Sequence, residues 1–94
     1  MRADKFLKLS RLVKRRTVAQ EMIEAGVVRL GGRAIKPASE VRAGDLLEIA
    51  YPSRTLIVSV ICDDESSLKR GAEAYELREE RRRERGGEND SSRS

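Results

Sequence analysis

The chain has 94 residues, of which 38% are charged, and its mean hydropathy is −0.59. It contains no histidine and one cysteine, Cys62, which excludes histidine-based catalysis, a disulfide framework and a cysteine–histidine zinc site within one chain. A chain this short forms one small domain without room for a deep substrate cavity, so we expect an open binding surface and not an enzyme. No apolar run approaches the roughly 18 residues of a membrane span and no signal-peptide core stands at the N-terminus, so we expect a cytoplasmic location.

Positive charge is concentrated at the beginning of the chain. Residues 1–36 hold ten of the twenty Lys and Arg residues but only three acidic residues, a net charge of +7, whereas the whole chain carries +4. Such one-signed clustering is typical of a protein that binds a polyanion. The one aromatic side chain in this segment, Phe6, is assigned to the core, so recognition should depend on phosphates and shape more than on base stacking. The sequence therefore predicts an RNA-binding surface.

Two helices are predicted in this basic segment. Residues 3–13 have an apolar face with helical spacing, and Asp4 places a negative charge in the first turn, where it can also orient a neighbouring arginine. Thr17-Val18-Ala19-Gln20 matches a capping box, which predicts a second helix that begins after Thr17 and ends at Gly26. The short link between the helices carries the basic run 14–16.

The middle of the chain predicts short antiparallel strands. Residues 27–30 and 33–35 are apolar segments joined by Gly31-Gly32, a strong signal for a two-residue hairpin turn. Further strands are expected at 46–51 and 55–62, with a turn between them. The fold class is therefore α+β, with two N-terminal helices packed on a small antiparallel sheet in a domain that spans residues 1–62.

The composition changes after residue 62. Residues 63–85 are expected to form a linker and a charged helix from about Leu68 to Arg85, with Leu68, Ala72 and Tyr75 on one narrow face. Residues 86–94 are expected to be a disordered tail. Six basic and seven acidic residues from 71 to 94 make this region nearly neutral, and therefore a poor RNA anchor by itself.

Several motifs together resemble the alpha-L RNA-binding module, which is named for ribosomal protein S-four and recurs in pseudouridine synthases and tyrosyl-tRNA synthetases. The resemblance covers roughly residues 1–60. The length of the chain and its basic run make it most similar to the RqcP family, whose members are stand-alone modules of this type. The motifs are Arg2-x-Asp4-Lys5-Phe6-Leu7, Ser10-Arg11, Lys14-Arg15-Arg16-Thr17, Gly26-Val27-Val28, Gly31-Gly32 and Val41-x-x-Gly44-Asp45.

The resemblance implies a function. RqcP-like proteins bind obstructed large ribosomal subunits, contact large-subunit rRNA and peptidyl-tRNA, and support C-terminal alanine tailing of the stalled chain. An RqcH-type tailing factor that recruits alanyl-tRNA is the implied partner; no cofactor or metal is implied, and off the ribosome we expect a monomer. By motif position Arg2 and Arg16 would be the main RNA contacts, and the same face would be extended by Lys5, Lys8, Arg11, Lys14 and Arg15.

Two arginines in the hairpin leave a choice open. Arg29 and Arg33 flank the glycine turn on its expected outer face, where they are either a second RNA contact or solvated charges. Arg29 is counted among the candidate RNA-binding residues.

Three other functions compete with the leading one. A heat-shock-type large-subunit recycling factor usually has a longer and strongly basic extension, which the near-neutral tail lacks. A pseudouridine synthase needs a separate catalytic domain, for which this chain has no room. A protein–protein adaptor would use the face formed by Leu68, Ala72 and Tyr75, and its complexes would be insensitive to salt.

Overall fold

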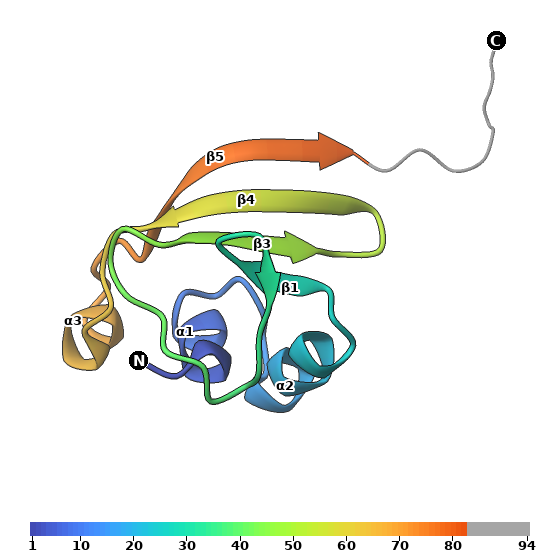
Figure 1. Cartoon of the computed structure of the whole chain (residues 1–94). Coiled ribbons are helices and arrows are strands. Elements are labelled where there is room, and N and C mark those ends of the chain that lie inside the picture. Colours follow the sequence, from blue (N-terminus) through green and yellow to red (C-terminus); the bar gives the residue numbers. More distant parts are fainter. Residues whose placement is uncertain (83–94) are drawn as a thin grey trace, which may run out of the picture.

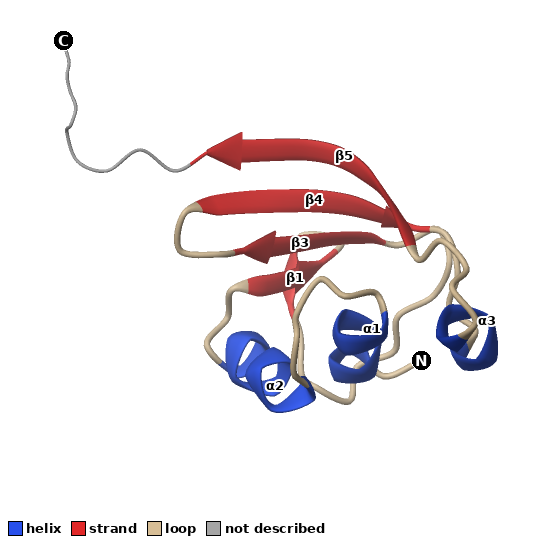
Figure 2. Ribbon diagram, turned by 180° about the vertical axis from the view of Figure 1, so that it is seen from behind, coloured by secondary structure: helices blue, strands red, loops and turns tan. Residues whose placement is uncertain are grey.

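A computed structural model describes residues 1–82, which form a five-stranded antiparallel sheet with three helices on one side (Figure 1). The same two layers are seen from behind (Figure 2). The strand order in the sheet is β2-β1-β3-β4-β5. The elements are α1 (Ala3–Leu9), α2 (Arg16–Glu24), β1 (Val28–Leu30), β2 (Arg33–Ala34), β3 (Leu46–Ala50), β4 (Arg54–Val60), α3 (Glu65–Lys69) and β5 (Tyr75–Arg82).

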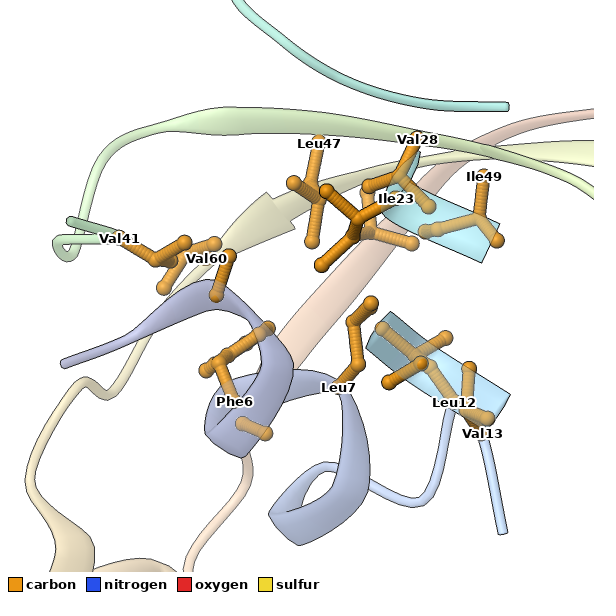
Figure 3. Close-up of a cluster of buried hydrophobic side chains, with 14 of the residues drawn as sticks. Phe6, Leu7, Leu12, Val13, Ile23, Val28, Val41, Leu47, Ile49 and Val60 are labelled. Carbon is orange, nitrogen blue, oxygen red and sulfur yellow. The ribbon is translucent and has the colours of Figure 1, made fainter. Parts of the chain in front are cut away.

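The core lies between the sheet and the two N-terminal helices. Along β3 and β4 buried residues alternate with more exposed ones, which is the pattern of strands that cover a core on one face only. Phe6 and Leu7 of α1 lie on the helix side of Leu47 and Ile49 of β3, and none of these four side chains is exposed (Figure 3). The layer of helices on one face of an antiparallel sheet confirms the α+β class that the sequence predicts.

The hairpin at Gly31-Gly32 is confirmed. The two glycines have φ values of 58° and 84°, which a two-residue turn of this kind needs at both central positions and which side chains with a Cβ rarely adopt. Leu30 pairs with Arg33 across the turn, and Arg29 pairs with Ala34. Direct partners project on the same side of a sheet, so Arg29 and Arg33 lie on opposite faces, not together on the outer one.

The first helix is shorter than the sequence predicts, because it ends at Leu9 and not at residue 13. The hydroxyl of Ser10 donates to the Leu7 carbonyl at 3.1 Å, and Arg11 has a left-handed φ of 68°. This turn directs Leu12 and Val13 into the core, although they no longer belong to the helix.

The second helix begins at Arg16, and the predicted capping box at Thr17 is wrong. Arg15 is the residue that precedes the helix, and it makes no side-chain cap hydrogen bond. Gln20, the expected partner of Thr17 in the box, instead donates from Nε2 to Oδ2 of Asp4 at 2.8 Å. In a capping box the glutamine would accept from a backbone amide at the cap, whereas here its amide group donates to a buried carboxylate on the neighbouring helix, which is a charge-assisted hydrogen bond.

The predicted helix over 68–85 is wrong for the part of it that the structure describes. Asp64 caps the short helix α3 by accepting from the Ser67 backbone at 2.9 Å, and Tyr75–Arg82 then form β5. β5 pairs with β4 along its whole length, with an irregularity opposite Ile57 and Val58. The pairing satisfies backbone groups of β4 that would otherwise form an open edge, which outweighs the helical preference of Glu and Arg.

This arrangement also removes the helix face expected from Leu68, Ala72 and Tyr75. Leu68 is buried in α3, Ala72 is exposed in the loop that follows, and Tyr75 begins β5. The end of the predicted helix at residues 83–85 and the predicted disordered tail at 86–94 lie outside the described residues. Among residues 1–82, no helix has the length and apolar content needed to cross a membrane.

Candidate nucleic-acid interface

The centre of the candidate site is a buried carboxylate between the two N-terminal helices. The side chain of Asp4 in α1 has no exposed surface. Arg2 donates to it through two nitrogens, from Nε to Oδ1 and from Nη2 to Oδ2, both at 3.1 Å. Nε of Arg16, at the start of α2, lies 3.3 Å from Oδ2. The two arginines that the resemblance assigns to RNA therefore meet at one acidic side chain.

Two further donors complete the surroundings of this carboxylate. The backbone amide of Lys5 donates to Oδ1 of Asp4 at 2.7 Å, and Gln20 donates to Oδ2. Burial raises the pKa of Asp4, but the hydrogen bonds from Arg2, Gln20, Arg16 and the Lys5 backbone lower it more, to about 2. Asp4 is therefore an anion at neutral pH, and a carboxylate that is this weakly basic and fully covered is poorly suited to accept a proton from a ligand.

The guanidinium groups of Arg2 and Arg16 remain accessible despite these contacts. Their side chains are 49% and 42% exposed, whereas the carboxylate beneath them is fully covered. An approaching anion therefore meets two cations but no exposed carboxylate at this point. An arginine carries five N–H donors, so one that contacts Asp4 through Nε keeps donors for a second acceptor.

Three other candidate residues lie along α1 and the turn after it. Nζ of Lys5 lies 2.6 Å from Oε1 of Glu65 in α3, so an acid offsets part of its charge. Lys8 is exposed in the last turn of α1, and Arg11 is exposed in the left-handed turn. Arg11 also lines a shallow hollow of about 240 Å³ together with residues of α3, among them Lys69.

Lys14 and Arg15 lie on the link between α1 and α2, and both are exposed. They border an apolar groove of about 940 Å³ between α2 and the β3–β4 turn, whose lining includes Val18, Met22 and Tyr51. The hydroxyl of Tyr51 donates to the carbonyl of Leu12 at 2.6 Å and fastens the β3–β4 turn to the link. The basic run is thereby held by the core at Leu12 and Val13 on one side and by α2 on the other.

Arg29 lies apart from the other candidates. Its neighbours in β1, Val28 and Leu30, face the helix layer, so Arg29 projects from the opposite face of the sheet. There its direct partner in β3 is Glu48, an acidic residue. The structure therefore does not bring Arg29 together with the residues of α1 and α2.

The sequence reasoning missed two residues that shape this site. Gln20 was expected to serve as a capping residue, and Glu65 was expected to lie in a solvated linker, yet they contact Asp4 and Lys5. No local signal identifies Glu65, because its partner lies sixty positions away. The spacing of Gln20 does offer a signal, since Arg16 and Gln20 are four residues apart and share one face of α2.

Comparison with known proteins defines the class first. The family model of the S4 domain matches residues 1–47, which include α1, α2 and the hairpin. The chain of a trimeric heat shock protein 15 from Vibrio cholerae has the same fold, with a TM-score of 0.70 and 22% identity over 83% of this chain and 81% of that one. The chain is an S4 domain protein.

Relatives of similar length define the family within that class. The RQC P-site tRNA stabilizing factor of Streptococcus pneumoniae is 38% identical over 83 residues, which cover 87% of this chain and 94% of the relative. The factor of the same name from Listeria innocua is 40% identical over 83 residues, or 87% of this chain and 90% of the relative. The chain belongs to the family of RQC P-site tRNA stabilizing factors, the RqcP family.

Proposed function

We propose that this protein binds obstructed large ribosomal subunits and stabilises the P-site tRNA there, by contacts to both the peptidyl-tRNA and the large-subunit rRNA. In this role it supports C-terminal alanine tailing of the stalled chain by an RqcH-type factor. The observation that carries the proposal is the meeting of Arg2 and Arg16 at the buried Asp4. This arrangement offers two fixed cations to a phosphate backbone.

The electrostatics of the described surface support binding rather than chemistry. Phosphate contacts by Lys and Arg give affinity by releasing counterions, and they need cations on an open surface. Three further exposed cations belong to the same helical layer as Arg2 and Arg16. They are Lys8 in α1 and Lys14 and Arg15 on the link between α1 and α2. The one buried carboxylate among residues 1–82, Asp4, is held as an anion by cationic partners, so a binding protein fits these residues better than an enzyme does.

The identity to the stabilizing factors favours this role over that of a heat-shock-type recycling factor. The relatives with that name are 38% and 40% identical and are matched over 94% and 90% of their own length, whereas the heat shock protein 15 of Escherichia coli, at 36% identity, is matched over 59% of its length. A role as protein–protein adaptor loses its main support, because Leu68, Ala72 and Tyr75 do not form one helix face.

The test is sedimentation of the C-terminally tagged protein from lysate, with sequencing of the RNA that travels with it. We expect co-migration with free large subunits enriched in tRNA, and loss of co-migration when Arg2 and Arg16 are both replaced by Ala. Arg78→Ala is the matched control, because Arg78 is an exposed arginine on β5, away from the helices.

Either of two outcomes would contradict the proposal. Wild-type protein that stays at the top of the gradient without RNA would show that the basic surface has another use. Equal loss of binding in the Arg78→Ala control would show that total charge, and not this site, is responsible. Thermal unfolding of each variant separates loss of binding from loss of fold.

A further inference from the structure

We infer that Arg2, Arg16 and the buried Asp4 form a single binding site for one phosphate group of an RNA backbone, in which each guanidinium bridges between the carboxylate and the phosphate. Asp4 is the positioning residue of this site and does not touch the ligand. The inference rests on the proposed function, since it takes the ligand to be RNA. It adds the number of phosphates that the two arginines hold and the reason why lysine does not replace arginine there.

Each arginine keeps nitrogen donors that its contact with Asp4 does not use. Arg2 uses Nε and Nη2 toward Asp4, so Nη1 remains for another acceptor. Arg16 contacts Asp4 through Nε, so both of its terminal nitrogens remain. Within residues 1–82, neither side chain has any other hydrogen-bond or ion-pair partner. Both guanidiniums thus have a used edge that faces the protein and an unused edge for a ligand.

Arg2 and Arg16 contact the same oxygen atom of Asp4. Nη2 of Arg2 and Nε of Arg16 lie 3.1 Å and 3.3 Å from the same atom, Oδ2 of Asp4. Both guanidiniums therefore converge on one atom, and we place a single phosphate on their exposed side, within reach of a free donor of each. Asp4 also offsets the repulsion between two adjacent cations, so they stay together before the ligand arrives.

Arginine suits this double contact better than lysine does. A lysine ammonium has three donors on one nitrogen, so it contacts the buried carboxylate and the phosphate together only if both anions approach that single atom. A planar guanidinium places its donors on separate edges, so it contacts both anions while keeping them apart. Lysine should therefore fail at position 16 even though it keeps the charge. Arg78 is the matched control, because it also pairs with an acidic residue, Glu76, but is exposed on β5, away from α1 and α2.

The experiment measures equilibrium binding of the full chain to purified vacant large subunits and, separately, to deacylated tRNA, over a series of salt concentrations. We expect Arg16→Lys to weaken binding by about tenfold or more, close to the effect of Arg16→Ala, because a charge-assisted hydrogen bond to the phosphate is lost. Arg78→Lys should change binding less than about twofold. The RNA on which Arg16→Lys has its effect, subunit or tRNA, identifies the source of the phosphate.

The number of phosphates is tested by combining Arg2→Ala with Arg16→Ala. If both arginines hold one phosphate, the double variant should bind little worse than either single variant. The slope of the logarithm of the binding constant against the logarithm of the salt concentration should also fall in magnitude by about one, in the double variant as in each single variant. If they hold separate phosphates, the losses multiply and the slope falls by about two, which would overturn the single-site inference.

The role of Asp4 is tested by Asp4→Asn, which keeps the size of the side chain and removes its charge. We expect weaker binding than wild type, and little further loss when Arg16→Lys is added, because the bridge is already broken. Arg16→Lys protein that binds like wild type, while Arg16→Ala does not, would overturn the bridging geometry even if Asp4→Asn failed to fold. Failure of the proposed function looks different, since wild-type protein would then bind neither RNA.

Discussion

Lys5 and Glu65 are joined by an ion pair of 2.6 Å that ties the first helix to α3. Glu65 is also paired with Lys69, whose Nζ lies 2.9 Å from its second oxygen. Hydrogen bonds from Lys5 and then from Lys69 lower the pKa of Glu65 to about 2. The acid therefore stays charged at any physiological pH and holds Lys5 toward α3 rather than toward solvent.

Removing this acid should strengthen RNA binding. We expect Glu65→Gln to bind large subunits more tightly than wild type at low salt, because Lys5 then presents its full charge to an approaching backbone. The gain should fade as salt is raised. Binding isotherms at several salt concentrations measure it. Glu76→Gln, which removes an equal charge from an exposed position on β5, is the control and should give a smaller gain.

The stability of the fold should depend on the ionisation of Asp4. Its pKa is about 2 in the folded protein and 3.8 without these contacts, so its contribution is complete above pH 4 and is lost as the pH falls toward 2. The shift corresponds to about 2 kcal/mol of unfolding free energy. Denaturant unfolding of wild type and Asp4→Asn across this range measures it. The difference between the two proteins should shrink as the pH falls, and a constant difference would contradict the assignment.

The hydrogen bond from Tyr51 to the Leu12 carbonyl should stabilise the fold measurably. The bond is 2.6 Å long and partly buried, so Tyr51→Phe leaves a carbonyl without this donor while the ring stays in place. We expect a loss of about 1 kcal/mol in unfolding free energy. Urea denaturation measures it, and Tyr51→Phe protein as stable as wild type would show that water replaces the hydroxyl at no cost.

Two adjacent leucines of β3 should respond very differently to truncation. Leu47 is fully buried, whereas Leu46 is 50% exposed on the other face. We expect Leu47→Ala to cost about 2–5 kcal/mol, because it leaves a cavity in the core, and Leu46→Ala to cost less than about 1 kcal/mol. Calorimetric melting of the pair measures this, and similar melting temperatures would mean that the strand register is not the one described.

Most of the fold was predictable because its signals are local. The glycine pair between two apolar segments predicts the hairpin at residues 31–32, and apolar segments bounded by turns predict the strands that form β3 and β4. The helix ends were less predictable. The turn at Arg11 depends on a side-chain bond from Ser10 and on the burial of Leu12, neither of which helical periodicity registers.

The parts that were not predictable depend on partners distant in sequence. Tyr75–Arg82 is rich in Glu and Arg, which favour a helix locally, and it becomes a strand because β4 offers an edge to pair with. For the site, the sequence predicts an arginine near Asp4, and the structure confirms that contact for Arg2 and Arg16. It does not predict Gln20 at the same carboxylate, since that contact depends on how the two helices pack.

The charged outer strand has a consequence for how this protein behaves in a crowded cell. After Tyr75, the residues of β5 are all exposed, and six of the seven are Glu or Arg. A sheet edge is a template on which a foreign strand can assemble, and a dense row of charged side chains makes that addition unfavourable. The same eight residues therefore complete the sheet and act as a gatekeeper against amyloid-like growth. A small domain with an aliphatic core is thereby less prone to aggregate through this edge of its sheet.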